Sequence, residues 1–206
     1  MFPQSNVADP ESYWTEWIDL YVNKRMVVYD IGANRGTLSR MFSNRGATIV
    51  AVEGFPVHLE ELASVLPSPP HYIVIAAAWD CCTPLRVTPT LGSGQIEISP
   101  ELLPDCNDLS TIPSSFYVQG TTLASLARKA KLPWPNVMKL DIQGSEVQAL
   151  EGARGILGDC ETIFCEHYEP SLLRHGHTNA DLEALLDQLG YAEAAEAGHD
   201  KVWRKK

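Results

Sequence analysis

The sequence predicts an α/β fold built on a mostly parallel, seven-stranded sheet with helices on both faces and a closing antiparallel hairpin. Short apolar runs alternate with stretches of helical periodicity along the chain. These runs are apolar almost throughout, which is typical of parallel strands that are buried on both faces. The length of 206 residues, with 45% hydrophobic and 20% charged residues, is that of one ordinary globular domain. We therefore expect residues 1–206 to form a single domain.

The first part of the chain alternates between helix and strand. Tyr13, Trp14, Trp17, Ile18 and Tyr21 have helical spacing and predict an amphipathic helix over 11–22, within an N-terminal helical extension of residues 1–25. Apolar, β-branched runs then predict strands, and a helical pattern around Leu38 and Phe42 fills the first gap. A second helix, stopped by a proline cluster, fills the next gap. The predicted strands are 26–29, 48–52 and 72–77, and the second helix is 58–66.

Residues 80–115 interrupt this alternation. They are rich in Pro, Gly, Ser and Thr and contain two short alternating pieces, at 85–88 and 95–99. We interpret the segment as an inserted hairpin and loop, not as a separate domain. Such an insertion can border a ligand-binding site, because binding residues concentrate on loops.

Regular elements return after the insertion. Apolar runs predict three further strands, with a helical pattern after each, and Gly190 ends the last helix. The remaining residues predict the closing hairpin. The strands are 116–119, 137–140 and 162–165, the helices are 122–130, 145–156 and 179–189, and the hairpin joins 191–195 to 201–204.

The charge balance disfavours some classes of function. Sixteen basic and 26 acidic residues give a net charge of −10, which argues against a general nucleic-acid binder and against docking on anionic membranes. The N-terminus lacks the features of a signal peptide, and the longest apolar stretch, residues 73–79, is too short to span a bilayer. The five cysteines are odd in number and lack zinc-site spacing, so we expect reduced thiols in a cytoplasmic protein.

Polar and acidic residues follow the predicted strands, where open α/β sheets bind their ligands. The first loop, residues 30–36, has the pattern D-x-G-x-x-x-G and not the dinucleotide fingerprint G-x-G-x-x-G. A carboxylate at Asp30 suits a ligand with a positively charged amino group, and Glu53 after the second strand could accept two ribose hydroxyls. Together they predict an S-adenosylmethionine site. The alternative is that these residues only form a turn and two strand-end caps.

These motifs resemble those of class I S-adenosylmethionine-dependent methyltransferases of the FkbM family. The resemblance rests on 28–36 (VYDIGANRG), 50–56 (VAVEGFP), 138–146 (MKLDIQGSE) with 149–153 (ALEGA), and 163–167 (IFCEH). It covers roughly residues 26–190 and implies a Rossmann-like class I methyltransferase fold. The sequence departs from the family pattern at Gly54 (usually Pro), Gln143 (more often Glu), Ala76 (often Asn) and Ala124 (often Asp).

The resemblance implies O-methyl transfer from S-adenosyl-L-methionine to a hydroxyl of a small molecule or sugar. The residues that it places at the cofactor are Asp30, Gly32, Ala33, Asn34, Gly36, Glu53, Gly54, Phe55, Ala77, Ala78, Asp141 and Gln143. The candidate catalytic residues at the strand ends are His167, Asp141, Glu146 and Glu166. We prefer His167 as the base because its ordinary pKa suits proton transfer at neutral pH, although it could instead pack and orient Glu166.

Several alternatives stay open from the sequence. The acceptor could be an amine, a carboxylate or an RNA ribose hydroxyl, or the chain could be a non-catalytic S-adenosylmethionine-binding subunit. We expect a small-molecule or glycan acceptor, no nucleic acid and no membrane. We also expect no metal, because His175 and His177 lack a third ligand at defined spacing. The alternative is a divalent metal held by Asp141 and its neighbours, although no ligand spacing defines such a site. The aromatic residues of 11–22 could pack on the sheet, cover the acceptor site or form a homodimer surface.

Overall fold

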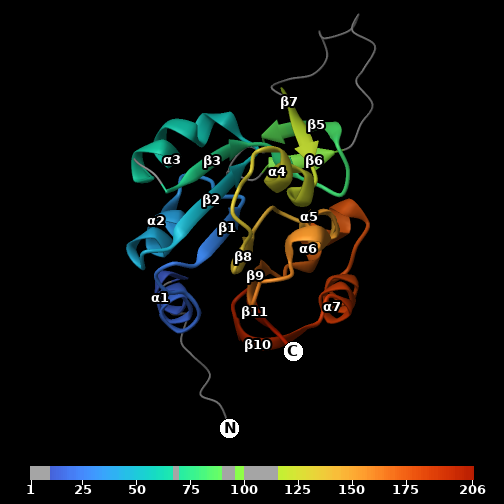
Figure 1. The fold of residues 1–206 in the computed structure, drawn as a ribbon. Helices are drawn as coiled ribbons and strands as arrows, with labels where there is room; N and C mark the ends of the chain where they lie inside the picture. The colour runs from blue at the N-terminus through green and yellow to red at the C-terminus, as the bar shows by residue number, and fades with distance from the viewer. Residues whose placement is uncertain (1–9, 67–69, 90–95, 100–115) are drawn as a thin grey trace, which may run out of the picture.

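A computed structural model describes residues 10–66, 70–89, 96–99 and 116–206 (Figure 1). Its centre is a seven-stranded sheet of order β3-β2-β1-β8-β9-β11-β10. The first five strands of this order run parallel, and β11 is antiparallel to both of its neighbours. The predicted mostly parallel sheet with a closing antiparallel hairpin is confirmed. The bounds are β1 (Val27–Ile31), β2 (Thr48–Glu53), β3 (Tyr72–Ile75), β8 (Val137–Leu140), β9 (Thr162–Glu166), β10 (Tyr191–Ala197) and β11 (Asp200–Lys205).

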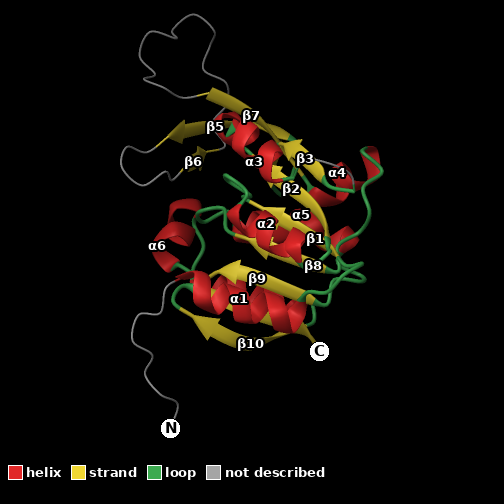
Figure 2. Cartoon of the chain, turned by 90° about the vertical axis from the view of Figure 1, so that its left-hand side faces the viewer, coloured by secondary structure: helices red, strands yellow, loops and turns green. Residues whose placement is uncertain are grey.

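Helices cover both faces of this sheet, as the near-continuous apolar strands predict. One face packs against α4, α5 and α7, and the other packs against α1, α2 and α3. Figure 2 shows α1 and α2 lying in front of the second face. The helices are α1 (Pro10–Tyr21), α2 (Thr37–Asn44), α3 (Leu59–Val65), α4 (Leu123–Lys129), α5 (Glu146–Ala153), α6 (Glu169–Leu172) and α7 (Asn179–Gln188). In the described residues, 3₁₀ turns adjoin them at η1 (Pro56–His58), η3 (Arg154–Ile156) and η4 (Leu173–His175).

The strand predicted over 72–77 is divided in the structure. β3 ends at Ile75, and β4 (Ala77–Ala78) belongs instead to a second, four-stranded sheet of order β4-β7-β5-β6. The other strands of this sheet are β5 (Thr83–Pro89), β6 (Ile96–Ser99) and β7 (Phe116–Thr121). β5 and β6 form the expected inserted hairpin, and the rest of the insertion, 90–95 and 100–115, lies outside the described residues.

The aromatic residues of α1 pack on the sheet. Trp14 and Trp17 are buried, and their rings lie 5.5 and 6.3 Å from the ring of Phe164 in β9. This contact fixes α1 over β9, so that the first helix lies beside the C-terminal hairpin. Of the alternatives for this helix, the contacts support packing on the sheet.

The structure bears on the expectations for membrane segments and for cysteines. In the described part of the chain, no helix is long and apolar enough to cross a membrane. Cys81 and Cys82 are exposed free thiols, whereas Cys160 and Cys165 are buried free thiols. Cys106 lies outside the described residues.

Candidate functional site

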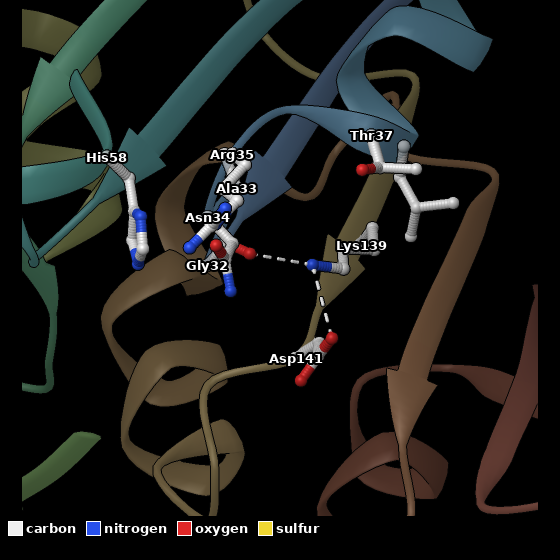
Figure 3. A pocket seen from close by; sticks show the side chains of 9 residues that line it. Gly32, Ala33, Asn34, Arg35, Thr37, His58, Lys139 and Asp141 are labelled. Carbon is white, nitrogen blue, oxygen red and sulfur yellow. Dashed lines mark hydrogen bonds and ion pairs between the residues drawn. The ribbon is translucent and has the colours of Figure 1, made fainter. Parts of the chain in front are cut away.

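A pocket of about 420 Å³ opens at the carboxyl ends of β1 and β8, the two central strands of the sheet (Figure 3). The loop after β1 forms one side and the end of β8 forms the other. Its lining residues are Gly32, Ala33, Asn34, Arg35, Thr37, Leu38, His58, Lys139 and Asp141. The structure therefore brings the predicted residues Gly32, Ala33, Asn34 and Asp141 together.

The glycine loop after β1 lies close to the backbone that follows β8. Gly32 has φ of +76°, and a Cβ added there would lie 2.0 Å from the carbonyl oxygen of Asp141. No other residue type fits this position. The backbone N–H groups of Gly32 and Ala33 both donate to the carbonyl of Val52, at 2.9 and 3.2 Å. The loop is therefore held between β2 and the end of β8.

Glu53, the last residue of β2, fixes the next part of this loop. Its side chain is buried, Oε2 accepts from the N–H of Asn34 at 2.7 Å, and Oε1 accepts from the N–H of Phe55 at 2.6 Å. Asn34 has φ of +50°, so the carboxylate supports a left-handed backbone turn. A carboxylate offers about four lone-pair directions, and Glu53 thus retains acceptor capacity beyond these two bonds.

Asp30 lies beneath the pocket and is absent from its lining. Its carboxylate is fully buried, accepts from the Ser39 hydroxyl at 2.6 Å, and pairs with the ammonium of Lys139 at 3.2 Å. Lys139 also donates to the carbonyl of Gly32 at 2.9 Å and lies 3.6 Å from Asp141 Oδ2; Figure 3 shows the links to Gly32 and Asp141. Burial lowers the pKa of Lys139, but attraction by Asp30 and Asp141 outweighs it and raises this pKa overall. The ammonium group of Lys139 is therefore protonated, and the carboxylates of Asp30 and Asp141 balance its charge.

Lys139 is a site residue that the sequence analysis missed. It lines the pocket, whereas the surrounding residues of β8 are apolar and face the cores. The available signal was a lysine within an apolar strand, two residues before Asp141. Its partner could not be identified from the sequence, because the pair depends on the register that sets Asp30 opposite Lys139 in neighbouring strands.

The turn after β8 carries Asp141 and Gln143 toward the end of β9. The side chain of Asp141 is 40% exposed, and Gln143 Nε2 donates to its Oδ1 at 3.1 Å and to Glu166 Oε2 at 3.5 Å. Gln143 has φ of +58° and Gly144 has φ of +109°. A Cβ on Gly144 would lie 2.1 Å from the Ser171 carbonyl oxygen, so α6 packs tightly against this turn.

Glu146, the first residue of α5, stabilises the same turn. It is buried, and its Oε1 accepts from the N–H groups of Ile142 at 3.0 Å and Gly144 at 3.3 Å. Burial raises the pKa of Glu146 to about 7, against the opposing effect of its backbone hydrogen bonds. Its observed contacts are with the backbone of the turn and not with the pocket lining.

Glu166, at the end of β9, faces a further carboxyl group. The β9–β11 register sets Glu166 opposite Asp200, and the Tyr13 hydroxyl donates to Asp200 Oδ2 at 2.7 Å. Burial, followed by repulsion from Asp141, Glu146 and Asp200, raises the pKa of Glu166 to about 8. The structure thus gathers Asp141, Glu166 and Asp200 at one edge of the sheet, and the sequence analysis missed Asp200.

His167 lies apart from these residues. Its Nε2 is 2.9 Å from Glu183 Oε1 on α7, and its backbone N–H donates to the His199 carbonyl at 2.6 Å. Cys165, two residues earlier, belongs to the core on the α7 side of the sheet. Alternation along the strand therefore directs His167 to that side, and the structure does not bring it to the pocket.

The other predicted cofactor residues lie around the pocket without lining it. Gly36 begins α2 with φ of +87°, and the Phe55 ring lies 5.1 Å from that of His58, which does line the pocket. Gly54 packs against Ala76 and Ala77, and Ala77 and Ala78 are buried in β4. Among the described residues, no three His, Cys, Asp or Glu side chains are arranged to hold a metal ion.

Comparison with known proteins identifies the family to which this chain belongs. The methyltransferase FkbM domain family matches residues 30–192. The hexuronic acid methyltransferase AglP of Haloferax volcanii is 27% identical over 142 residues, which are 68% of this chain and 55% of that protein. The chain thus spans about half the length of this relative.

Solved structures share the fold at low sequence identity. Precorrin-6y C5,15-methyltransferase of Geobacter metallireducens has a TM-score of 0.54 and 13% identity, covering 100% of this chain and 94% of its own. Aeropyrum pernix fibrillarin, solved with bound S-adenosyl-L-methionine, has a TM-score of 0.52 and 12% identity, covering 89% and 67%. The putative RNA methyltransferase PH1948 of Pyrococcus horikoshii has a TM-score of 0.51 and 13% identity, covering 99% and 91%. The predicted Rossmann-like methyltransferase fold is confirmed.

Proposed function

Because this chain belongs to the methyltransferase FkbM domain family, we propose that it binds S-adenosylmethionine in the pocket at the ends of β1 and β8 and methylates a hydroxyl of a sugar or another small molecule. The observation that carries this proposal is the convergence of the glycine loop and Asp141 on one pocket at the centre of the sheet edge. Ligands of open α/β sheets bind at this edge.

The residues of the pocket suit the cofactor. Its volume of about 420 Å³ lies within the usual range of small-molecule sites. The partly exposed carboxylate of Asp141 favours a ligand with a cationic amino or sulfonium group. Lys139 does not oppose such a ligand strongly, because Asp30 compensates its charge within the sheet. Glu53 is absent from the lining but holds the N–H of Asn34, which does line the pocket, and its remaining acceptor capacity suits ribose hydroxyls.

The residues of the chain orient the cofactor and the acceptor relative to each other. The cofactor supplies an activated methyl group for in-line displacement by the acceptor oxygen. Lys139, which Asp30 holds by an ion pair, donates to the carbonyl of Gly32, and Glu53 accepts from the N–H of Asn34. These three residues therefore act on the ligand through the backbone of the glycine loop. Such pre-organised backbone lowers the entropic cost of aligning the reactants. The acceptor hydroxyl must also lose a proton, which requires a base nearby.

A sugar acceptor is the finer part of this proposal. It is supported by the relative from Haloferax volcanii, which is named as a hexuronic acid methyltransferase. Two alternatives remain. The acceptor could be an amine, a carboxylate or an RNA ribose hydroxyl, or the chain could be a non-catalytic cofactor-binding subunit; cofactor binding and methyl transfer, measured separately, distinguish them.

Calorimetric titration with S-adenosylmethionine and with NAD tests the cofactor. We expect S-adenosylmethionine to bind and Asp141→Ala to weaken its affinity at least tenfold, about 1.4 kcal/mol, because the pocket loses its exposed carboxylate. The control is Asp159→Ala, an exposed aspartate remote from the pocket lining, which should leave the affinity unchanged. Absence of binding at millimolar concentration, or preference for NAD, would contradict the proposal.

Transfer itself is tested with methyl-labelled S-adenosylmethionine and a panel of acceptors. The panel should include neutral sugars, hexuronic acids, amines and short RNA. Label recovered in an ether-linked methyl of a sugar supports the proposal. Binding of the cofactor without transfer to any hydroxylated acceptor would favour the non-catalytic subunit instead.

A further inference from the structure

We propose that Glu166 takes up the proton that the acceptor hydroxyl loses, and that binding of the cationic cofactor first drives Glu166 into its ionised form. This inference rests on the proposed function, because it requires S-adenosylmethionine in the pocket. It differs from the sequence-based preference for His167, whose side chain pairs with Glu183 on α7.

The position of Glu166 relative to the pocket supports this role. Asp141 lines the pocket, and Gln143 Nε2 lies between the two carboxyl groups, 3.1 Å from Asp141 Oδ1 and 3.5 Å from Glu166 Oε2. Glu166 is thus one side chain away from the lining. Gln143 Oε1 is buried and has no hydrogen-bond partner within the part of the chain that the structure describes, so this amide can accept from a ligand donor.

The turn after β8, which carries Gln143 between the two carboxyl groups, is held by several contacts. Gln143 has a left-handed backbone, Gly144 packs against the Ser171 carbonyl, and Glu146 accepts from two N–H groups of the turn. A side chain on Gly144 would collide with α6. The packing of this turn therefore fixes the positions of Asp141, Gln143 and Glu166 relative to one another.

The charges around Glu166 make its ionisation responsive to a cation. Asp141 faces it from the turn after β8, Glu146 from α5 and Asp200 from β11, while Lys139 is the cation that opposes them. Lys139 is already shared with Asp30. Burial and these carboxylates raise the pKa of Glu166 to about 8, so that without a bound cation it is mostly protonated at pH 7.

A cation bound next to Asp141 shifts this balance. The positive charge favours the ionised form of Glu166, which releases its proton to solvent. In the transfer step, a lone pair of the acceptor oxygen forms the new C–O bond, the C–S bonding pair stays on sulfur, and the hydroxyl proton passes to Glu166. The sulfur product, S-adenosylhomocysteine, lacks the sulfonium charge, so Glu166 then retains the proton.

Proton linkage measured by calorimetry tests this without any acceptor. Titrations at pH 7 in phosphate and in Tris, whose ionisation enthalpies differ, give the number of protons released on binding. We expect wild-type protein to release roughly half a proton or more per S-adenosylmethionine, and much less with S-adenosylhomocysteine. Glu166→Gln should still bind S-adenosylmethionine but lose most of this release.

Two glutamine controls identify the group. Glu183→Gln alters a half-buried carboxylate that pairs with His167 and Lys201 and should leave the release unchanged. His167→Gln should also leave it unchanged. Release that persists in Glu166→Gln, that disappears in His167→Gln, or that is equal for the two ligands would overturn the inference.

Asp200→Asn provides a second variant in case Glu166→Gln does not fold. It removes one of the carboxylates facing Glu166, lowers the pKa of Glu166, and should reduce the proton release at pH 7. An unchanged release in a folded Asp200→Asn protein contradicts the inference. Failure of S-adenosylmethionine to bind wild-type protein contradicts the proposed function as well, whereas binding without proton release contradicts this inference alone.

Discussion

Lys139 is an ammonium group in the middle of the sheet, and its environment explains why it can be there. It is 3% exposed, and its contacts are the carboxylates of Asp30 and Asp141 and the carbonyl of Gly32. A buried ion pair of this kind contributes little net stability compared with apolar residues, because both charges are desolvated. Its value lies in fixing the glycine loop on β8.

Removal of one partner of this pair should be more harmful than removal of both. Lys139→Met leaves the carboxylate of Asp30 buried without a cation, and we expect a loss of about 3 kcal/mol or more in the free energy of unfolding. The double variant Asp30→Asn/Lys139→Met should recover most of this loss. Urea denaturation of the wild-type protein, the single variants Asp30→Asn and Lys139→Met, and the double variant measures it. A double variant whose loss of stability equals the sum of the two single losses would contradict the pairing.

The site residues that sequence reasoning found are those with local motifs. Gly32, Asn34 and Asp141 stand next to predicted strand ends, so their place at the sheet edge followed from chain order. Lys139 and Asp200 were missed because their roles depend on strand register. The role of the Tyr13 hydroxyl depends on how α1 docks, which no local pattern shows.

At the scale of elements, periodicity predicted the strands and helices of the large sheet, and most boundaries agree within a few residues. The short helix α6 was not predicted, because four residues are too few for a helical pattern. The division between β3 and β4 was also missed, since Ile73 to Trp79 is one uninterrupted apolar run. Pairing with β2 and with β7, not composition, separates the two strands.

The docking of α1 should depend on its buried rings. Trp17 is 5% exposed and stacks on Phe164, so we expect Trp17→Ala to lower the free energy of unfolding by about 3–5 kcal/mol. Leu20 lies on the same helix but is 66% exposed, and Leu20→Ala should change stability by less than about 0.5 kcal/mol. Urea denaturation compares the two. Equal effects would show that α1 is not held by this face.

At the scale of the whole molecule, the carboxyl groups at the sheet edge should make stability depend on pH. Burial raises the pKa of Glu166 to about 8 and that of Glu146 to about 7, above their ordinary value of 4.5. At pH values between 4.5 and these raised pKa values, the two carboxyl groups of the folded protein keep protons that the unfolded chain has lost. Their contribution to stability is therefore complete below pH 4.5 and disappears as pH rises through 7 and 8.

We therefore expect the free energy of unfolding to be lower at pH 8.5 than at pH 5.5, by about 1 kcal/mol or more. Urea denaturation at the two pH values measures the difference. Glu166→Gln should reduce it, because an amide does not titrate in this range, and Glu151→Gln, at an exposed site on α5, should not. A pH dependence of the same size in Glu166→Gln would contradict the assignment.

The pairing of β1 with β8 also has a consequence for synthesis of the protein on the ribosome. Asp30 is made early, but Lys139 follows only after α2, β2, the insertion and α4 have been translated. Until then, β1 in a nascent assembly of β1, β2 and β3 lacks its β8 neighbour, and Asp30 lacks its counter-ion. The first half of the sheet is therefore a poor cotranslational folding unit, and we expect stable ribosome-bound structure only once β8 has emerged from the exit tunnel.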